Sequence, residues 1–251
     1  MEPIKIIGGR SLSHRIAFIS ETYVAEARCN KTGKITTSIR PLPKFIIVLL
    51  RVNHFIPETL RMFAFVMGLM SPKMRILLIF YLSFGLYLQI KMKDIETAIS
   101  DRASLSILLP LLALELAFFV GAFVFVRRLA SWHGAEHMTI AAYERTRSIE
   151  IKNIESDSPI HPKCGGRLAL PLFLVLGIAV ALSKEFDISA FVFAVPLFEI
   201  ILWIDKLKGF DKIPLFSQAS KLLQRYFTTK KPGKLEIETA QAAIKSLLSA
   251  H

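Results

Sequence analysis

The chain has 251 residues, of which 53% are hydrophobic and 21% charged, and its formal net charge is +12. This composition is too apolar for an ordinary soluble domain and too rich in apolar and aromatic side chains for a disordered chain. Two cysteines in a basic chain exclude a disulfide scaffold, and we expect both thiols to be reduced. Residues 1–15 are mostly polar or mixed, so no signal peptide is expected.

The N-terminal part is predicted to be cytoplasmic and to contain β-structure. Residues 4–40 hold three apolar-rich segments, IKII, YVAEAR and KITTSIR, with a turn sequence at residues 30–33. This pattern predicts a β-hairpin with one preceding strand. The apolar stretch Phe55–Met70 also carries Glu58 and Arg61, which favours an interfacial helix over a membrane span.

Long apolar runs then dominate the chain, and they make a mainly α membrane protein with four transmembrane helices the predicted fold class. The run 105–126 has one charge in 22 residues, which is enough to cross a hydrocarbon core of about 30 Å. The shorter run 76–90 rises only about 22 Å, so it must extend past its ends or thin the bilayer. The other two predicted spans are residues 168–183 and 188–204.

Basic residues are concentrated on one side of these spans. Of the 32 Lys and Arg residues, 28 precede the first span, lie between the second and third, or follow the fourth. The positive-inside rule makes that side cytoplasmic, so both termini and the loop 127–167 are expected on the cytoplasmic side of the cell membrane. The same rule accounts for the net charge. No nucleic-acid recognition module is visible, so the expected partner is the lipid bilayer.

The tail after the fourth span is short and polar. Residues 229–233 break the chain, and residues 235–248 are rich in Ala, Leu, Ile, Glu and Lys, which predicts a helix. We therefore divide the chain into three parts: a cytoplasmic segment with a hairpin and an interfacial helix, a four-span membrane domain, and a cytoplasmic tail. Their bounds are residues 1–75, 76–205 and 206–251.

One motif after the second span can carry chemistry. The segment WHGAEHMTIAAYE contains His133, Glu136 and His137 in the pattern H-x-x-E-H. Two histidines four residues apart share a helix face and can bind one Zn²⁺ ion, and a carboxylate beside the ion can take a proton from bound water. The alternative is that both histidines form ordinary hydrogen bonds near the membrane surface.

The same loop offers a further ligand. His161 and Cys164 form an H-x-x-C pair, and both imidazole and thiolate suit Zn²⁺. The alternative is that this segment binds no metal and is only the turn that starts the third span. Glu144 lies on the same helix face as His137 but about 10 Å along the axis, too far to share the ion. A supporting contact or a substrate contact is expected for Glu144.

Two carboxylates lie within predicted spans. Glu115 and Glu199 are both near mid-membrane, where an ionisable side chain is costly and usually faces a polar interior. We expect both to face the helix bundle, close to the cytoplasmic site or to each other. They can bind a metal or relay protons, or they can be neutral and hydrogen-bonded to neighbouring helices.

The segments HGAEHMTIAAYE and HPKCGG, followed by a Pro-containing span with Glu199, resemble the YqhQ-like family of membrane proteins, whose members are often labelled metal-dependent enzymes. IIGGRSLS near the N-terminus and FSQASKLLQRYFTTKKPGKLEIETAQAAIKSLL at the C-terminus are similar to the ends of that family. One departure is the run from Arg10 to His14, which replaces the Gln, small apolar residues and Glu-Gly of the family. The resemblance implies an integral membrane protein and supplies no reaction.

Two functions remain open at this stage. The first is a membrane-embedded hydrolase in which His133 and His137 bind Zn²⁺, His161 or Cys164 is the third ligand, and Glu136 is the general base. The second is a non-enzymatic accessory or assembly factor that contacts other membrane proteins or the ribosome, with a structural metal site or none. Four protein ligands would indicate a structural site, whereas three ligands beside Glu136 would indicate catalysis.

Overall fold

The computed structural model describes residues 4–51, 57–70, 75–76, 80, 83, 105–186 and 190–251. The predicted span 76–90 falls almost entirely outside these residues, and the side chain of Glu115 is outside the description as well. The chain divides into two compact units, Met70–Val126 and a larger unit formed by Met1–Leu69 with Arg127–His251. All candidate site residues other than Glu115 belong to the larger unit.

The N-terminal segment forms a four-stranded antiparallel sheet, with the strands in chain order. The strands are β1 (Gly8–Leu12), β2 (Arg15–Ile19), β3 (Tyr23–Cys29) and β4 (Ile35–Pro41). The predicted hairpin is confirmed: β3 pairs with β4, and the Asn30 side chain accepts from the main-chain N–H groups of Thr32 and Lys34 in the turn. Gly33 closes this turn with φ of 81°, a conformation that glycine adopts without steric cost.

The prediction of one preceding strand at IKII was wrong, because two strands precede the hairpin and neither lies at residues 4–7. The central strand β2 reads RIAFI without a polar alternation. A continuous apolar run is expected for a strand that is covered on both faces. Ile16 and Phe18 point into one buried cluster, whereas Ile19 lies against Gly68 on the other face.

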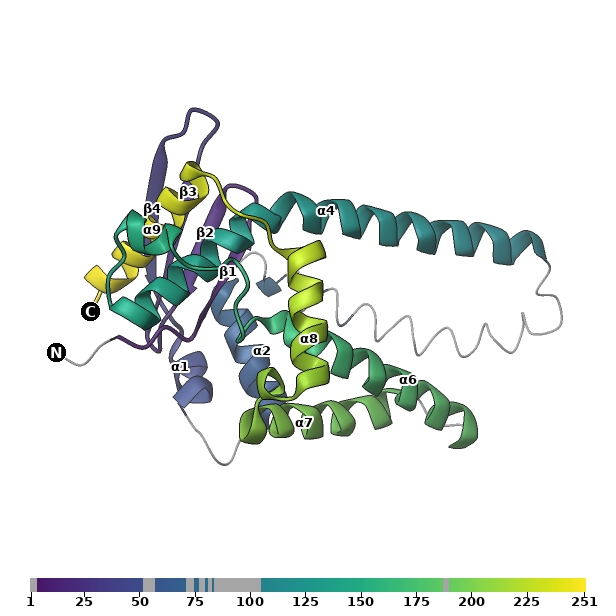
Figure 1. Ribbon diagram of the computed structural model, residues 1–251. Coiled ribbons are helices and arrows are strands. Elements are labelled where there is room, and N and C mark those ends of the chain that lie inside the picture. Colours follow the sequence, from purple (N-terminus) through teal and green to yellow (C-terminus); the bar gives the residue numbers. More distant parts are fainter. Residues whose placement is uncertain are drawn as a thin grey trace. The chain divides into compact units, whose positions relative to one another are not determined.

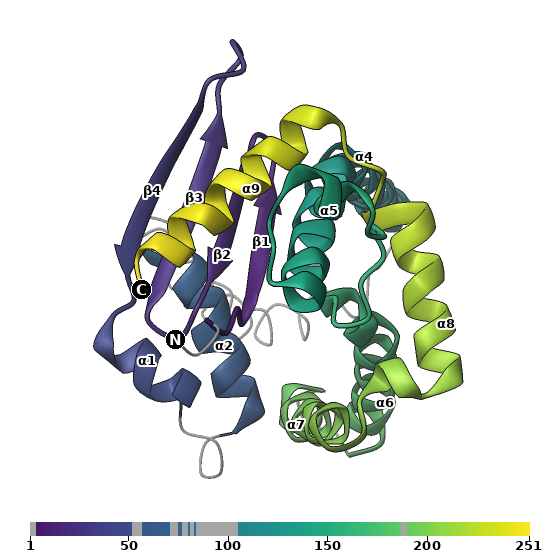
Figure 2. The ribbon, with the colours of Figure 1, turned by 60° about the vertical axis from the view of Figure 1, so that its left-hand side comes forward.

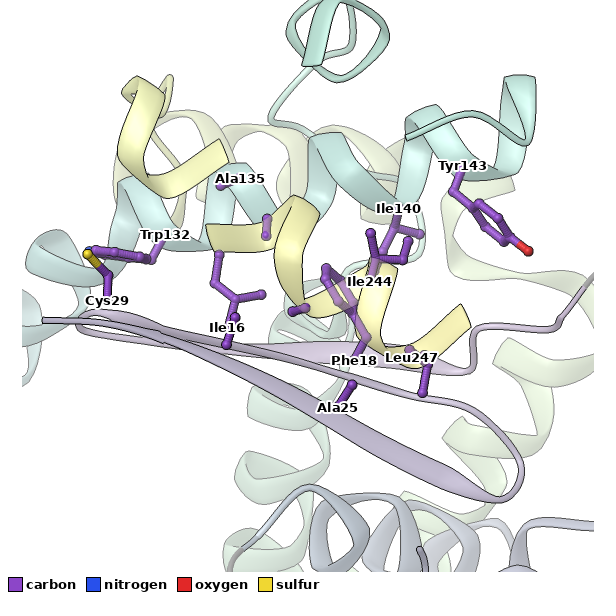
Figure 3. Close-up of a cluster of buried hydrophobic side chains, with 13 residues drawn as sticks. Ile16, Phe18, Ala25, Cys29, Trp132, Ala135, Ile140, Tyr143, Ile244 and Leu247 are labelled. Carbon is purple, nitrogen blue, oxygen red and sulfur yellow. The ribbon is translucent and has the colours of Figure 1, made fainter. Parts of the chain in front are cut away.

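Helices cover both faces of this sheet (Figure 1). On one face lie α9 (Lys234–Ser249) and the last turns of α4 (Leu105–Thr146). Figure 3 shows Trp132, Ala135 and Ile140 of α4 beside Ile244 and Leu247 of α9, all above the strands. On the other face lies α2 (Glu58–Leu69), joined to the sheet through α1 (Lys44–Arg51). The helix predicted for Phe55–Met70 is therefore present as α2, and α1 was not predicted.

The segment expected as a loop, 127–167, is helical over its first half. Residues 127–146 continue α4 without interruption, because they contain no proline and mostly good helix formers. The helix ends at Arg147, whose φ of 55° and N–H bond to the Tyr143 carbonyl close the last turn. A short helix, α5 (Ile151–Glu155), and an extended stretch then lead to the 3₁₀ turn η1 (Gly165–Leu168).

Two apolar helices follow, α6 (Ala169–Phe186) and α7 (Ala190–Lys208), and they pack on each other. Within the described residues, one helical stretch, Gly165–Ser183, is long and apolar enough to cross a membrane, by length and composition alone. The predicted spans 105–126, 168–183 and 188–204 are helical wherever the structure describes them, but four membrane crossings stay a prediction.

The C-terminal tail contains more structure than the predicted helix. After the short turn η2 (Phe210–Lys212), helix α8 (Pro214–Leu223) runs into a π-helical turn, η3 (Gln224–Thr228). The helix predicted for residues 235–248 is confirmed as α9. It packs on β2, β3 and β4 (Figure 2), so the C-terminal tail completes the core of the N-terminal sheet.

Candidate metal centre

The last turns of α4 hold the two histidines of the H-x-x-E-H motif. Trp132 and Ala135 face the sheet (Figure 3), and the helical rotation of about 100° per residue turns His133 and His137 to another side of α4. Their ring centroids are 4.2 Å apart. The spacing of four residues therefore brings two imidazoles together, as the sequence predicts.

A third ligand arrives from the segment before η1. The Cys164 Sγ lies 3.8 Å from His133 Nε2. His133, His137 and Cys164 each offer one ligand atom, and these three atoms lie within 4.8 Å of one another. This group can hold a metal ion, and the prediction that residues 161–164 return to the two histidines is confirmed for Cys164.

Main-chain carbonyl groups contact the Nδ1 atoms of both histidines. His133 Nδ1 lies 3.0 Å from the carbonyl oxygen of Thr228, and His137 Nδ1 lies 2.7 Å from that of Pro159. A carbonyl oxygen only accepts, so each Nδ1 carries the proton and each Nε2 keeps a free lone pair. Metal-binding histidines are oriented in this way, with the second nitrogen donating to a carbonyl or carboxylate.

The ligand set is electrically neutral in the absence of an ion. Burial lowers the pKa of His133, and burial together with the neighbouring His133 lowers the pKa of His137 to about 3. Burial also raises the pKa of the Cys164 thiol, against the opposing effect of the Gly166 N–H group. The imidazoles are therefore ready to bind near neutral pH, whereas the thiol must lose its proton to become a ligand.

Glu136 points to the sheet and lies outside the ligand group. A Cβ atom on Gly9 of β1 would lie 2.8 Å from the Glu136 carboxylate oxygen, so glycine leaves the space that this carboxylate fills. Ser11 of the same strand donates a hydrogen bond to it. Burial raises the pKa of Glu136 to about 7, against the effects of Ser11 and Arg10. The expected role of Glu136 as general base stays a prediction.

His161 is close to the ligand group without belonging to it. Its ring centroid is 5.6 Å from that of His137, and its Nε2 lies 3.7 Å from a carboxylate oxygen of Glu144. Glu144 also receives a bond of 2.9 Å from the Lys163 ammonium group. Burial lowers the pKa of His161, against the nearby charge of Glu144. Glu144 therefore contacts the segment that carries Cys164, and its expected role as a supporting contact or a substrate contact stays a prediction.

Glu199 has a partner away from these ligands. Its carboxylate accepts the main-chain N–H groups of Glu58 and Thr59, at 2.6 Å and 2.9 Å, at the first turn of α2. A carboxylate here satisfies N–H groups that lack an intrahelical partner and stabilises the positive end of the helix. Glu199 thus connects α7 to α2, and its predicted proximity to Glu115 falls outside the described residues.

Several residues outside the predicted motif hold the segments around the ligand group in place. Gln224, fully buried at the start of η3, accepts from the His161 N–H at 2.9 Å and donates to the His161 carbonyl at 3.2 Å. The N–H of Lys230 donates to the Ala130 carbonyl, which places the segment between η3 and α9 beside α4. A Cβ on Gly134 would lie 2.1 Å from the Lys230 carbonyl oxygen. Nothing in the spacing of these residues marks them as neighbours.

Comparison with known proteins identifies the family of this chain. The family model described as DUF1385, protein of unknown function, matches residues 42–250, which include all three candidate ligands. The chain belongs to this DUF1385 family. It is similar to the uncharacterized protein YqhQ of Bacillus subtilis (strain 168), with 26% identity over 148 residues, or 55% of this chain and 46% of that protein. The match thus spans about half the length of this relative, and no solved structure matches the chain.

Proposed function

We propose that this DUF1385 member is a multi-pass protein of the cell membrane with a Zn²⁺-dependent hydrolase site at the cytoplasmic surface. The observation that supports the site best is the pair of carbonyl contacts to His133 and His137. They direct two unprotonated Nε2 atoms toward the region of Cys164. Two histidines held in this way by segments remote in sequence are typical of a metal centre.

The donor set fits Zn²⁺. Two imidazoles and one thiolate are borderline-soft ligands, and three protein ligands with one open position are the usual arrangement of catalytic zinc sites. Zn–N bonds are about 2.0 Å long and Zn–S bonds about 2.3 Å. To bind one ion, the two ligand atoms that now lie farthest apart must therefore come about 1 Å closer together. Side-chain rotation can supply such a movement. An ion held here supplies Lewis acidity and activates water.

The protein's own groups then have separate tasks. His133, His137 and Cys164 bind the ion, and the carbonyls of Thr228 and Pro159 keep the rings oriented. Glu136, buried against Gly9, accepts and holds a proton on its carboxylate. The Ser11 hydroxyl orients that carboxylate from the sheet side.

The membrane placement rests on the sequence pattern and on exposed apolar surface. Four spans, with both termini cytoplasmic, account for the segregation of basic residues. Large apolar side chains are exposed on both α6 and α7, among them Phe173, Ile178, Val195 and Leu207. Such surface on a packed helix pair is expected where lipid surrounds it.

The alternative is a non-enzymatic accessory factor of the membrane with a structural metal site. The proximity of His161 to His137 favours this alternative, because a rotation of His161 away from Glu144 would add a fourth ligand. A closed site with four protein ligands stabilises a fold and leaves no position for substrate. The two functions therefore differ in the role of His161.

Metal analysis of the purified full-length chain tests the proposal. One equivalent of zinc is expected in the wild type and in His161→Ala, and less than a tenth of an equivalent in His133→Ala or Cys164→Ala. Loss of zinc in His161→Ala would favour the structural site. Zinc retained in His133→Ala would overturn the proposed ligands. Cysteine accessibility at residues 95 and 150, expected on opposite sides, tests the topology.

A further inference from the structure

Helix α8 and the turn η3 present two different faces. The inner face holds the site: Ser220 and Gln224 are buried, and Gln224 clamps the main chain of His161. Phe216 packs its ring against Phe210 at a centroid distance of 4.8 Å. This face therefore has its partners within the larger unit.

The outer face carries a stripe of large exposed side chains. Leu215, Leu222 and Tyr226 are 66%, 54% and 59% exposed. Their spacing of seven and four residues keeps all three within about 20° of one line along a helix. A contiguous exposed apolar stripe is typical of a surface that contacts a partner.

Basic residues flank the stripe. Lys221 and Arg225 are both exposed beside it, and residues 206–231 contain seven basic residues and one acidic residue. A short helix with an apolar stripe and a basic border is typical of a helix that lies in a membrane interface, where it binds anionic headgroups.

Residues next to the ends of three predicted spans contact α8 or η3. Helix α8 packs on η1, where α6 begins, and on η2, which follows the end of α7. Arg127, the first residue after the predicted span 105–126, donates to the Tyr226 carbonyl at 2.8 Å. In Figure 1, α8 runs crosswise to α7. A helix next to the basic ends of spans, and directed across α7, is expected to lie along the plane of the bilayer surface.

From these observations we propose that the outer face of α8 and η3 binds the anionic lipid surface of the membrane. This inference deepens the proposed function and rests on its membrane placement. Leu215, Leu222 and Tyr226 insert at the level of the headgroups, and Lys221 and Arg225 contact lipid phosphates. Because the inner face of the same helix holds His161 and the Thr228 carbonyl, the candidate metal centre lies directly at the lipid surface, within reach of a substrate that enters from the bilayer.

The test uses the full-length chain with Cys29→Ser and Cys164→Ser, in nanodiscs of pure phosphatidylcholine or with one quarter phosphatidylglycerol. Single cysteines replace Leu222, Ile178 of α6 or Thr32 of the hairpin turn, and each carries a nitroxide spin label. Collision rates with oxygen and with a water-soluble nickel complex report the surroundings of each label. Ile178→Cys is expected in lipid, Thr32→Cys in water, and Leu222→Cys at shallow depth in lipid, with at least threefold less nickel contact in anionic discs.

The outcomes separate the two proposals. Leu222→Cys in water while Ile178→Cys is in lipid would overturn the lipid contact of α8 and leave the membrane placement intact. Both labels in water would overturn both. Equal shielding of Leu222→Cys in the two lipid mixtures would overturn recognition of anionic lipid. Lys221→Glu with Arg225→Glu is expected to abolish the difference between the mixtures, whereas Lys31→Glu with Lys34→Glu, which changes charge equally, should preserve it.

Discussion

His133 Nδ1 lies 3.0 Å from the carbonyl oxygen of Thr228, although 95 positions separate the two residues in the chain. This contact joins one turn of α4, the turn that carries both histidines, to the C-terminal tail. It also requires that the tail run directly against α4. The absence of a side chain at Gly134 makes this approach possible, since the Lys230 carbonyl occupies the place of a Cβ.

Gly134→Ala is therefore expected to destabilise the protein and weaken metal binding together. The added methyl group must displace a main-chain carbonyl, and such overpacking costs about 1–3 kcal/mol of unfolding free energy. Thermal unfolding and zinc titration of the same samples measure both effects. Gly121→Ala, in the same helix but with nothing within 4 Å of the added Cβ, is the matched control and should lose neither. Equal behaviour of the two variants would contradict this account.

Gln224→Ala is expected to release the segment that carries Cys164. The variant removes both hydrogen bonds to the main chain of His161 and leaves buried polar groups without partners, at a cost of about 2–4 kcal/mol. Alkylation of Cys164 by a maleimide in the metal-free protein should become at least tenfold faster, because the thiol is 6% exposed in the native fold. Gln218→Ala, at an exposed position of the preceding helix α8, should react at the wild-type rate.

Zinc affinity is expected to rise with pH. Burial raises the pKa of the Cys164 thiol, and each ion that binds must displace its proton. The histidines contribute little to this dependence near neutral pH, because burial lowers the pKa of both. The apparent association constant should increase about tenfold per pH unit between about pH 6 and 8. Cys164→Ala should bind more weakly, and its affinity should vary less with pH; an equal slope would show that another group releases the proton.

Glu136 is expected to make the metal-free protein less stable as pH rises. Its pKa is about 7 in the fold, above the ordinary value of 4.5, so the folded state binds more protons than the unfolded state between these values. The unfolding free energy of the protein is therefore unaffected by Glu136 below pH 4.5. It decreases by about 3 kcal/mol as the pH rises through 7 and the buried carboxyl group ionises. Denaturant titrations at pH 5 and 8 measure this decrease.

Glu136→Gln is the informative variant for both roles of this carboxylate. It should lose most of the pH-dependent decrease in stability, because the amide does not ionise. It should also keep zinc, since Glu136 is outside the ligand group. Any hydrolytic activity is expected to fall by about 10²-fold or more if Glu136 is the general base. Full activity in Glu136→Gln would rule out that role.

Local pattern was sufficient for several features. The Asn30–Gly33 turn, the helix at residues 235–248 and the pairing of His133 with His137 follow from interactions between residues fewer than five positions apart or from regular helical spacing. Local pattern does not choose between His161 and Cys164, since both lie in one short turn whose direction depends on remote contacts.

Tertiary structure decided the rest, because it brings together segments with no common periodicity. Gln224 and Thr228 reach the ligands only because α8 folds back over η1, and the Glu136 carboxylate faces Gly9 only because the sheet lies under α4. The hydrophobic core on one face of the sheet is completed by α9, which begins more than 200 residues after β2. The sequence alone determined which side chains can bind a metal, and the packing of the tail determined which of them meet.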